Sequence, residues 1–410
     1  TGRTSNPPLA QRYLVLKGEE PMTVDVAIIG AGPAGGMAAL RLADTGLKVT
    51  VLEKKRIPRT KACGGAISTA TYELLRQWFS PSIADRVDHL RLTRNYETPK
   101  ITKTLTKPLL LLDRSRFDCQ LIEAALEKGR RDISFRDGWP VERIEETKNG
   151  LRIHGPKHES IRAGYLIGAD GAGSIASRFL GSRPRAAAGV AIDASVTTTA
   201  DGRAPYRSTA EFNYGCVPSG YGWIFPKGDR LSCGIGSWRR PFPTRRELHD
   251  FLQRSLPAGS IRSVQMQTHP VPIWSGYRRL ASGNVLLAGD AANLVDPVTG
   301  EGIRFALLSG MLAAETILSL AGGAAERIRP PPTESAKAAG GLDYERRIHH
   351  TVGRELEIRR LFALPVFLEA PDLFYRKFVL EGRDMAATYR NLAEKLNTRV
   401  AEPISPMANS

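Results

Sequence analysis

The residues with the clearest chemical role are the glycines of the segment Gly-Ala-Gly-Pro-Ala-Gly at positions 30–35. Gly30, Gly32 and Gly35 allow a tight turn and let the backbone approach a pyrophosphate at the N-terminus of the following helix. Glu53 ends the next apolar segment, where a carboxylate can accept hydrogen bonds from an adenosine ribose. A glutamate there disfavours a ribose 2′-phosphate, so the segment predicts a site for FAD or NAD.

Two later segments can complete this site with polar groups. Asp170 lies in Gly-Ala-Asp-Gly-Ala-Gly-Ser at 168–174, and Asp290 lies in Gly-Asp-Ala-Ala. In that position Asp290 can bind a ribityl or ribose hydroxyl. Pro297 precedes a long apolar helix expected from Gly302, whose N-terminus can face the electron-rich end of a flavin ring. Because these segments follow the glycine segment in this order and spacing, they indicate a flavin site.

Three further side chains are candidates for catalysis. Cys63 follows a basic run and precedes two glycines, and a cationic, glycine-rich loop favours a reactive cysteine. It can exchange a proton, or serve as a small residue packed on the flavin ring. Tyr221 and Trp223 can line a substrate channel or belong to a sheet core. Lys227, in the same segment, is expected at the surface.

The elements that must position these residues follow from hydrophobic periodicity. A buried strand at 24–29, a helix at 33–45 and a strand at 48–52 form a βαβ unit with a right-handed crossover. A strand at 109–112, a helix at 116–128 and a short strand at 165–167 follow. These segments predict a parallel sheet covered by helices.

The pattern changes between residues 186 and 272, where Thr, Ser and aromatic residues alternate between Gly and Pro residues. This favours an antiparallel sheet. A buried strand returns at 284–288, followed by a helix at 302–320. The predicted fold class is α/β, with a Rossmann-like FAD-binding domain interleaved with the antiparallel sheet. The predicted parts are a flexible tail at 1–22, the first FAD-binding part at 23–185, the antiparallel-sheet substrate domain at 186–280, the returning FAD-binding part at 281–325, a linker at 326–341 and a C-terminal helical region at 342–410.

Composition and charge limit the classes of partner. The formal net charge of +16 indicates an acidic partner or a basic solvated surface. No nucleic-acid-binding motif is present, so we expect no nucleic acid partner. The four cysteines show no metal-ligand spacing, which predicts no metal site and a reducing cytosol. The sequence holds no run of 18 apolar residues, so a membrane-spanning helix is not expected.

The segments together resemble known flavoproteins. The three nucleotide segments are similar to the p-hydroxybenzoate hydroxylase-type fold, with Arg114 in a matching segment near the flavin. Lys-Ala-Cys-Gly-Gly-Ala-Ile-Ser at 61–68, Tyr-Gly-Trp-Ile-Phe-Pro-Lys at 221–227 and Cys-Gly-Ile-Gly at 233–236 resemble the geranylgeranyl reductase family. The resemblance covers residues 22–325 and implies FAD as cofactor. It implies flavin contacts at Ala34, Glu53, Cys63, Gly64, Arg114, Asp290, Gly302 and Ile303.

The resemblance implies reduction of isoprenoid double bonds in a prenylated lipid, quinone or chlorophyll. Reduced flavin would deliver a hydride to the alkene, while an acid supplies a proton. Cys63 and Tyr221 are the candidate acids, with Trp223 beside the ring. NADPH or a ferredoxin would supply electrons, since the sequence shows no second nucleotide-binding motif.

Other interpretations remain open on the same residues. The first is a flavin monooxygenase or halogenase, although Tyr221 and Phe225 depart from the Trp-x-Trp-x-Ile-Pro segment of halogenases. The second is a flavin-containing membrane-surface or RNA-associated protein without turnover. Apolar residues beside arginines after position 359 predict a helical cap or a face that docks on an anionic bilayer. We expect a cytosolic protein, peripheral at a membrane, with a prenylated substrate and a ferredoxin as partners.

Overall fold

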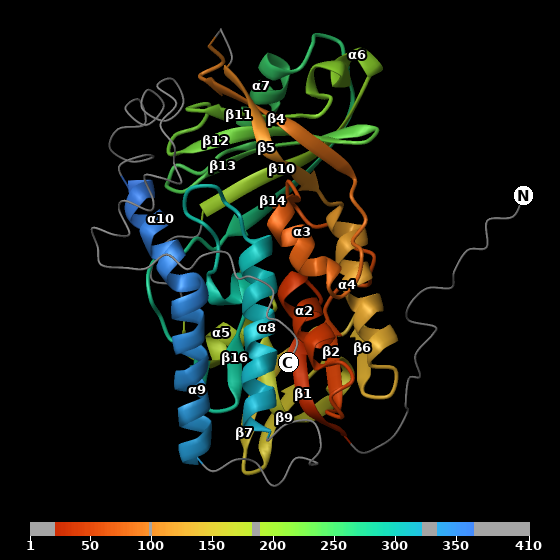
Figure 1. Cartoon of the computed structure of the whole chain (residues 1–410), viewed down its shortest axis with the longest axis vertical. Helices are drawn as coiled ribbons and strands as arrows, with labels where there is room; N and C mark the ends of the chain where they lie inside the picture. Colours follow the sequence, from red (N-terminus) through yellow and green to blue (C-terminus); the bar gives the residue numbers. More distant parts are fainter. Residues whose placement is uncertain (1–20, 98–100, 183–188, 322–333, 365–410) are drawn as a thin grey trace, which may run out of the picture.

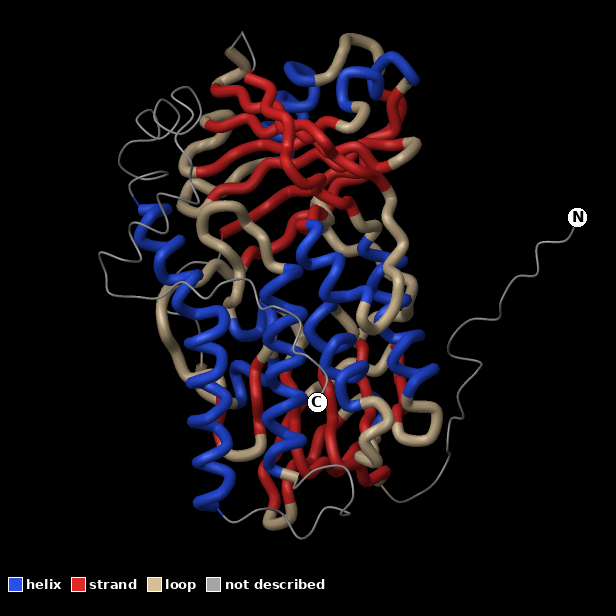
Figure 2. The backbone as a smooth tube through the Cα atoms, viewed as in Figure 1, coloured by secondary structure: helices blue, strands red, loops and turns tan. Residues whose placement is uncertain are grey.

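The computed structural model describes residues 21–97, 101–182, 189–321 and 334–364 (Figure 1). Strands gather into two sheets at opposite ends of an elongated molecule, and long helices lie against one of them (Figure 2). This mixed α/β architecture confirms the predicted fold class.

The first sheet has the strand order β15-β16-β9-β1-β2-β6, with β8 joined to β9 and β7 to β8. Strands β16, β9, β1, β2 and β6 are mutually parallel. The mostly apolar sequences of β1, β2 and β16 suit strands covered on both faces. The strands are β1 (Met22–Ile29), β2 (Val49–Glu53), β6 (Ile133–Asp137), β7 (Arg143–Thr147), β8 (Gly150–His154), β9 (Ser160–Gly168), β15 (Ala281–Ser282) and β16 (Val285–Leu287).

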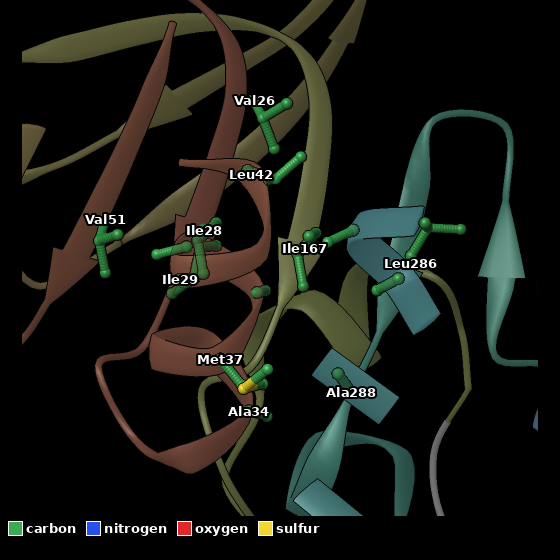
Figure 3. Packing of buried hydrophobic residues seen from close by; sticks show 14 of the residues in the cluster. Val26, Ile28, Ile29, Ala34, Met37, Leu42, Val51, Ile167, Leu286 and Ala288 are labelled. Carbon is green, nitrogen blue, oxygen red and sulfur yellow. The ribbon is translucent and has the colours of Figure 1, made fainter. Parts of the chain in front are cut away.

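Helices cover this sheet and close its core. Helix α2 (Pro33–Leu42) packs against α4 (Arg114–Lys128) and α8 (Ile303–Leu320). Helix α2 ends before the predicted boundary because Asp44 adopts φ 64°, which interrupts the helix. Figure 3 shows part of the buried cluster, to which Val26 of β1 contributes with side chains of α2, β9 and β16.

Helix α8 is long and apolar enough, by length and composition, to cross a membrane. Within the protein, however, 61% of its apolar window is buried, and it packs between α2 and the C-terminal helix α9. A core helix of a folded domain has the same composition. Helix α8 is therefore a buried core helix of the domain that contains the first sheet.

The second sheet has the order β14-β10-β13-β12-β11-β4-β5-β3. All its pairs are antiparallel except β11 with β4. The strands are β3 (Ala66–Ser68), β4 (Asp85–Arg94), β5 (Ile101–Leu111), β10 (Gly189–Thr198), β11 (Thr209–Tyr214), β12 (Gly220–Lys227), β13 (Arg230–Ser237) and β14 (Ile261–Val271).

Two separate stretches of chain thus build the second sheet, whereas the sequence predicts only the later one. Strands β3, β4 and β5 belong to the stretch that the sequence assigns to the FAD-binding domain. Strands β4 and β5 mix polar and apolar residues, as in strands that are exposed on one face. The predicted strand at 109–112 overlaps the end of β5. Shorter helices complete this region: α3 (Thr69–Arg76), α6 (Ala200–Arg203) and α7 (Arg245–Ser255). Helix α5 (Ile175–Phe179) instead packs against β7, β9 and β16 of the first sheet.

The first C-terminal helix lies along the first sheet, and the second continues towards the second sheet (Figure 1). Helix α9 (Glu334–Ile348) is followed by a π-helical turn (His349–Gly353) and α10 (Arg354–Leu364). The predicted linker is therefore wrong over residues 334–341, where an alanine-rich sequence favours helix. Residues 1–20 of the predicted tail, 326–333 of the linker and 365–410, which hold most of the predicted bilayer-docking residues, lie outside the described residues.

The described part of the C-terminal region packs on the body of the protein. The Tyr344 hydroxyl donates to the carbonyl of Leu287, and the Glu345 carboxylate accepts a hydrogen bond from the Leu280 N–H at 2.7 Å. The indole N–H of Trp274 donates to the Glu357 carboxylate at 2.9 Å. These contacts support the cap interpretation for α9 and α10.

Candidate flavin site

The glycine loop between β1 and α2 contains two glycines that the chain itself requires. Gly30 adopts φ 101°, and a Cβ there would lie 2.3 Å from the carbonyl oxygen of Ala169. A Cβ on Gly35 would lie 1.8 Å from the carbonyl oxygen of Gly30. Any larger residue would push β1, β9 and α2 apart, so these glycines permit the close packing of helix and sheet.

Gly32 differs from its neighbours because the protein leaves open space in front of it. Its φ of −86° is available to any residue. The nearest described atom to a Cβ there is Nη2 of Arg59, at 3.9 Å. No side chain among the described residues caps the N-terminus of α2, so its first N–H groups can bind an anion. A pyrophosphate fits this cradle.

Glu53 lies beside the cradle and is almost fully buried, with 4% exposed. Its Oε2 accepts the N–H of Ala31 at 3.0 Å, and Oε1 accepts the N–H of Lys55 at 3.0 Å. The guanidinium of Arg59 contacts the same carboxylate at 3.3 Å. Glu53 thus fixes the glycine loop from the end of β2, in the position predicted for a ribose contact.

Arg59 and Asp118 extend this network, although motif comparison did not single them out as site residues. Arg59 Nη1 donates to Asp118 at 3.0 Å, and Arg114 binds the same carboxylate through Nε at 2.9 Å and Nη2 at 3.0 Å. Burial opposes the charge of Arg114, yet the carboxylate of Asp118 and the nearby Cys63 raise its pKa. The predicted flavin residue Arg114 is therefore a fixed cation beside Cys63.

Asp170 mainly caps a helix. Its Oδ2 accepts the N–H groups of Ile175 at 2.6 Å and Ala176 at 3.4 Å at the start of α5. Its Oδ1 is buried with no hydrogen-bond partner among the described residues. Burial raises the pKa of this carboxyl group. Because its Oδ1 has no partner among the described residues, Asp170 can accept one hydrogen bond from a ligand.

Asp290 is joined to the second sheet through His269 of β14. His269 Nε2 lies 3.9 Å from the Asp290 carboxylate and 2.5 Å from Nζ of Lys61. Burial alone would raise the pKa of Asp290, but His269 and Lys61 hold it below its usual range. Burial lowers the pKa of Lys61. Sequence inspection missed His269 because a single histidine in a strand has no motif around it.

The loop before α8 contains Pro297 and leads to Gly302 and Ile303. The fully buried carboxylate of Asp296 accepts the N–H of Val298 at 2.8 Å and also binds Arg359 of α10. Gly302 provides no side-chain cap, so the N–H groups that open α8 can face a ligand. The C-terminal helices thus help to hold the loop predicted to contact the flavin.

Tyr221 fixes the same loop from the second sheet. Its hydroxyl donates to the carbonyl of Thr299, and a Cβ on Gly300 would lie 3.0 Å from that hydroxyl oxygen. Burial raises the pKa of Tyr221 well above its usual value. The hydroxyl proton is therefore held by a backbone carbonyl, which disfavours Tyr221 as an acid.

The loop that contains Cys63 packs on the second sheet. Cys63 Sγ accepts the N–H of Gly65 at 3.3 Å. A Cβ on Gly64 would lie 2.6 Å from the Phe225 ring and 3.6 Å from Nε1 of Trp223. Trp223 is 8% exposed, and its buried Nε1 has no partner in the described segments. The structure thus brings the Cys63–Gly64 loop to the side of Trp223.

Lys227 does not lie free at the surface as expected. Its Nζ lies 3.4 Å from the carbonyl oxygen of Cys63, and burial lowers its pKa. Lys227 shares one face of β12 with Tyr221, Trp223 and Phe225, because side chains alternate along a strand.

An apolar face leads away from the Cys63 loop. Phe212 of β11 packs edge-on to Phe225 at 5.3 Å and to Tyr221 at 5.7 Å between ring centroids. The same cluster includes Tyr214, whose pKa burial raises to about 12. It continues through Leu90, Leu105 and Leu109 of β4 and β5, and Ala363 of α10 joins it. The site thus has a polar cradle at one end and an apolar surface at the other.

Comparisons with known proteins agree with this geometry. Residues 23–328 match the family described as the FAD binding domain. The chain is 29% identical over 362 residues to a digeranylgeranylglycerophospholipid reductase of Methanothrix thermoacetophila, covering 86% of this chain and 89% of the relative.

Two solved structures share the fold. A geranylgeranyl bacteriochlorophyll reductase-like protein from Thermoplasma acidophilum aligns with a TM-score of 0.74 at 23% identity, covering 92% of this chain and 99% of that one. A triple mutant of the flavin-dependent brominase Bmp2 aligns with a TM-score of 0.67 at 17% identity, covering 91% and 99%. The chain therefore belongs to the geranylgeranyl reductase family of FAD-dependent oxidoreductases.

Proposed function

We propose that the protein saturates isoprenoid double bonds of a prenylated substrate. The observation that carries this proposal is the apolar face that begins at Phe225 and Trp223, beside Gly64, and continues to Leu90 and Leu105. An extended apolar chain matches such a surface, and the relative named as a digeranylgeranylglycerophospholipid reductase supports the substrate class. FAD, bound in the cradle, would supply the hydride.

The residues of this chain would bind the substrate, exclude water and supply a proton. The aromatic side chains of β11 and β12 present an apolar wall to the alkene. An isolated alkene has no carbonyl group to activate it, so an acid must protonate one carbon as the other receives hydride. We assign this acid to Cys63, because the residue is partly exposed and its neighbour Gly64 lies beside Trp223. Tyr221 would instead hold the loop before α8.

The proposal includes the electron donor and the location of the protein in the cell. NADPH or an acidic ferredoxin would reduce the flavin, and the net charge of +16 suits an anionic partner or lipid surface. We propose a cytosolic protein that works at a membrane surface, where prenylated lipids are found.

The test is anaerobic. The purified protein is reduced with dithionite and mixed with geranylgeranyl diphosphate or with a phospholipid, chlorophyll or quinone that carries a geranylgeranyl chain. Flavin absorbance and product mass are then followed. We expect flavin reoxidation and a mass gain of about two units per reduced bond with one of these classes. The fully saturated analogue is the matched control and should leave the flavin reduced. Flavin that stays reduced with every alkene would contradict the proposal.

A second candidate is a flavin monooxygenase or halogenase, which the fold similarity to the brominase favours. Tyr221 and Phe225 stand where the halogenase segment has Trp and Ile. Admission of oxygen and bromide distinguishes the two functions. Substrate-dependent oxygen consumption with a brominated or hydroxylated product would support this candidate.

A further inference from the structure

A pair of charged side chains lies beneath the Cys63 loop on the second sheet. Nζ of Lys227, at the end of β12, is 3.4 Å from the carbonyl oxygen of Cys63 and 3.0 Å from the position that a Cβ on Gly65 would take. Asp193 of β10 lies close enough to Cys63 for the backbone N–H of Cys63 to lower the pKa of its carboxyl group. Lys227 therefore lies beside the carbonyl group of Cys63, and Asp193 lies near its N–H group.

Sheet register explains how residues from two strands reach one peptide. Asp193 is opposite Gly234 of β13, and Gly234 is opposite Trp223 of β12. Directly opposed residues of antiparallel strands share a face, so Asp193 lies on the same face as Trp223 and Lys227. Gly234 provides room, because a Cβ there would lie 2.1 Å from the Trp223 ring.

The charges of this pair depend on one another. Burial raises the pKa of Asp193 and lowers that of Lys227, and the attraction between the two groups opposes both effects. The hydroxyl of Ser232 also donates to Asp193 at 3.1 Å. Asp113 and Arg230, which pair with each other, also face Lys227. Two buried charged groups that attract each other contribute little net stability, so the place of Lys227 and Asp193 under the loop needs another explanation.

We propose that Lys227 and Asp193 are positioning residues that hold Cys63 by its carbonyl and N–H groups. The loop needs such anchors because Gly64 and Gly65 have no side chains to fix it, and Gly65 adopts φ 75°. The pair thereby sets the place of the Cys63 thiol relative to Trp223. Its catalytic consequence rests on the proposed function, whereas its effect on the loop does not.

Hydrogen–deuterium exchange of the FAD-loaded protein tests the proposal directly. We expect the variants K227M and D193N to exchange the amides of residues 61–66 at least about tenfold faster, as for loss of one charge-assisted hydrogen bond. Exchange in β1 and α2 should be unchanged. K227R should recover part of the protection. K107M, which removes an exposed lysine of β5, is the matched control and should match wild type.

Kinetics with a prenylated substrate give the second readout. We expect kcat to fall at least about tenfold in K227M and D193N while KM stays within about threefold, because positioning acts on the reacting group. Wild-type exchange at residues 61–66 in both folded variants would overturn the proposal, as would an unselective rise throughout the protein. If K227M fails to fold, the exchange and kinetics of the isosteric variant D193N test the proposal. Wild-type protein that reduces no alkene would refute the proposed function but leave the exchange result standing.

Discussion

The glycine loop allows two neighbouring substitutions to separate folding from cofactor binding. A methyl group at Gly35 would lie 1.8 Å from the carbonyl oxygen of Gly30, a backbone atom that cannot rotate away. A methyl group at Gly32 would meet no described atom nearer than 3.9 Å. The first substitution therefore collides with the protein, and the second occupies the space that the pyrophosphate should fill.

The expected magnitudes follow from these contacts. In G35A the backbone must move by more than about 1 Å to restore an ordinary contact, and such overpacking costs about 1–3 kcal/mol or more. The helical preference of Ala over Gly returns about 1 kcal/mol at most. In G32A the folding free energy should change by about 0.5 kcal/mol or less. Loss of one charge-assisted hydrogen bond to the pyrophosphate would weaken FAD binding roughly 10- to 150-fold.

Urea unfolding of the apoprotein and FAD titration by fluorescence quenching measure the two quantities independently. We expect G35A to unfold at a lower urea concentration, whereas G32A should unfold as wild type and bind FAD weakly. A G32A protein with wild-type affinity for FAD would refute the assignment of the cradle. A G35A apoprotein as stable as wild type would show that the contact between Gly30 and Gly35 is absent.

Three further results are expected. R359L should lower the free energy of unfolding by about 1–3 kcal/mol in urea titration, because it leaves the buried Asp296 carboxylate without its cation, and R359K should restore part of it. Y221F should keep alkene reduction within about tenfold of wild type, because its hydroxyl is bound to Thr299; loss of more than about a hundredfold would make Tyr221 the acid. The folded-state pKa of Asp290 is lowered, so its charge stabilises the protein above about pH 4 and this contribution is lost as pH falls further. The difference in urea midpoint between wild type and D290N should shrink below about pH 4, and a constant difference down to pH 3 would contradict the cause assigned here.

Local sequence signals were sufficient for the elements around the cofactor. Apolar runs predicted β1, β2 and β16, with glycine after the first and the last, and the low polarity of 302–320 predicted α8. The membership of β4 in the second sheet could not be predicted, because it pairs with β11 from a distant part of the chain. Such strand pairings depend on tertiary contacts, which the hydrophobic periodicity and composition of a segment do not encode.

The positions of two site residues, Lys227 and His269, were not predicted from the sequence, for different reasons. Lys227 was misplaced at the surface although a signal was present, since strand alternation puts it on the face of Trp223. His269 could not be found at all, because only the approach of β14 to the Asp290 loop gives it a partner. The remaining predicted site residues keep the roles proposed for them until ligand binding is measured.

The order of strands in the first sheet has a consequence for synthesis on the ribosome. Strand β9 pairs with β1 on one side and with β16 on the other, yet β16 begins at Val285 while β1 begins at Met22. Strand β9 ends at Gly168, so at ribosomal rates of about 5–20 residues per second roughly 6–25 s pass before β16 is made. During that time the end of β9, from Leu166 to Gly168, presents an unpaired edge, because β8 covers only its first residues. We therefore expect newly made chains to depend on chaperones until α8 has left the ribosome.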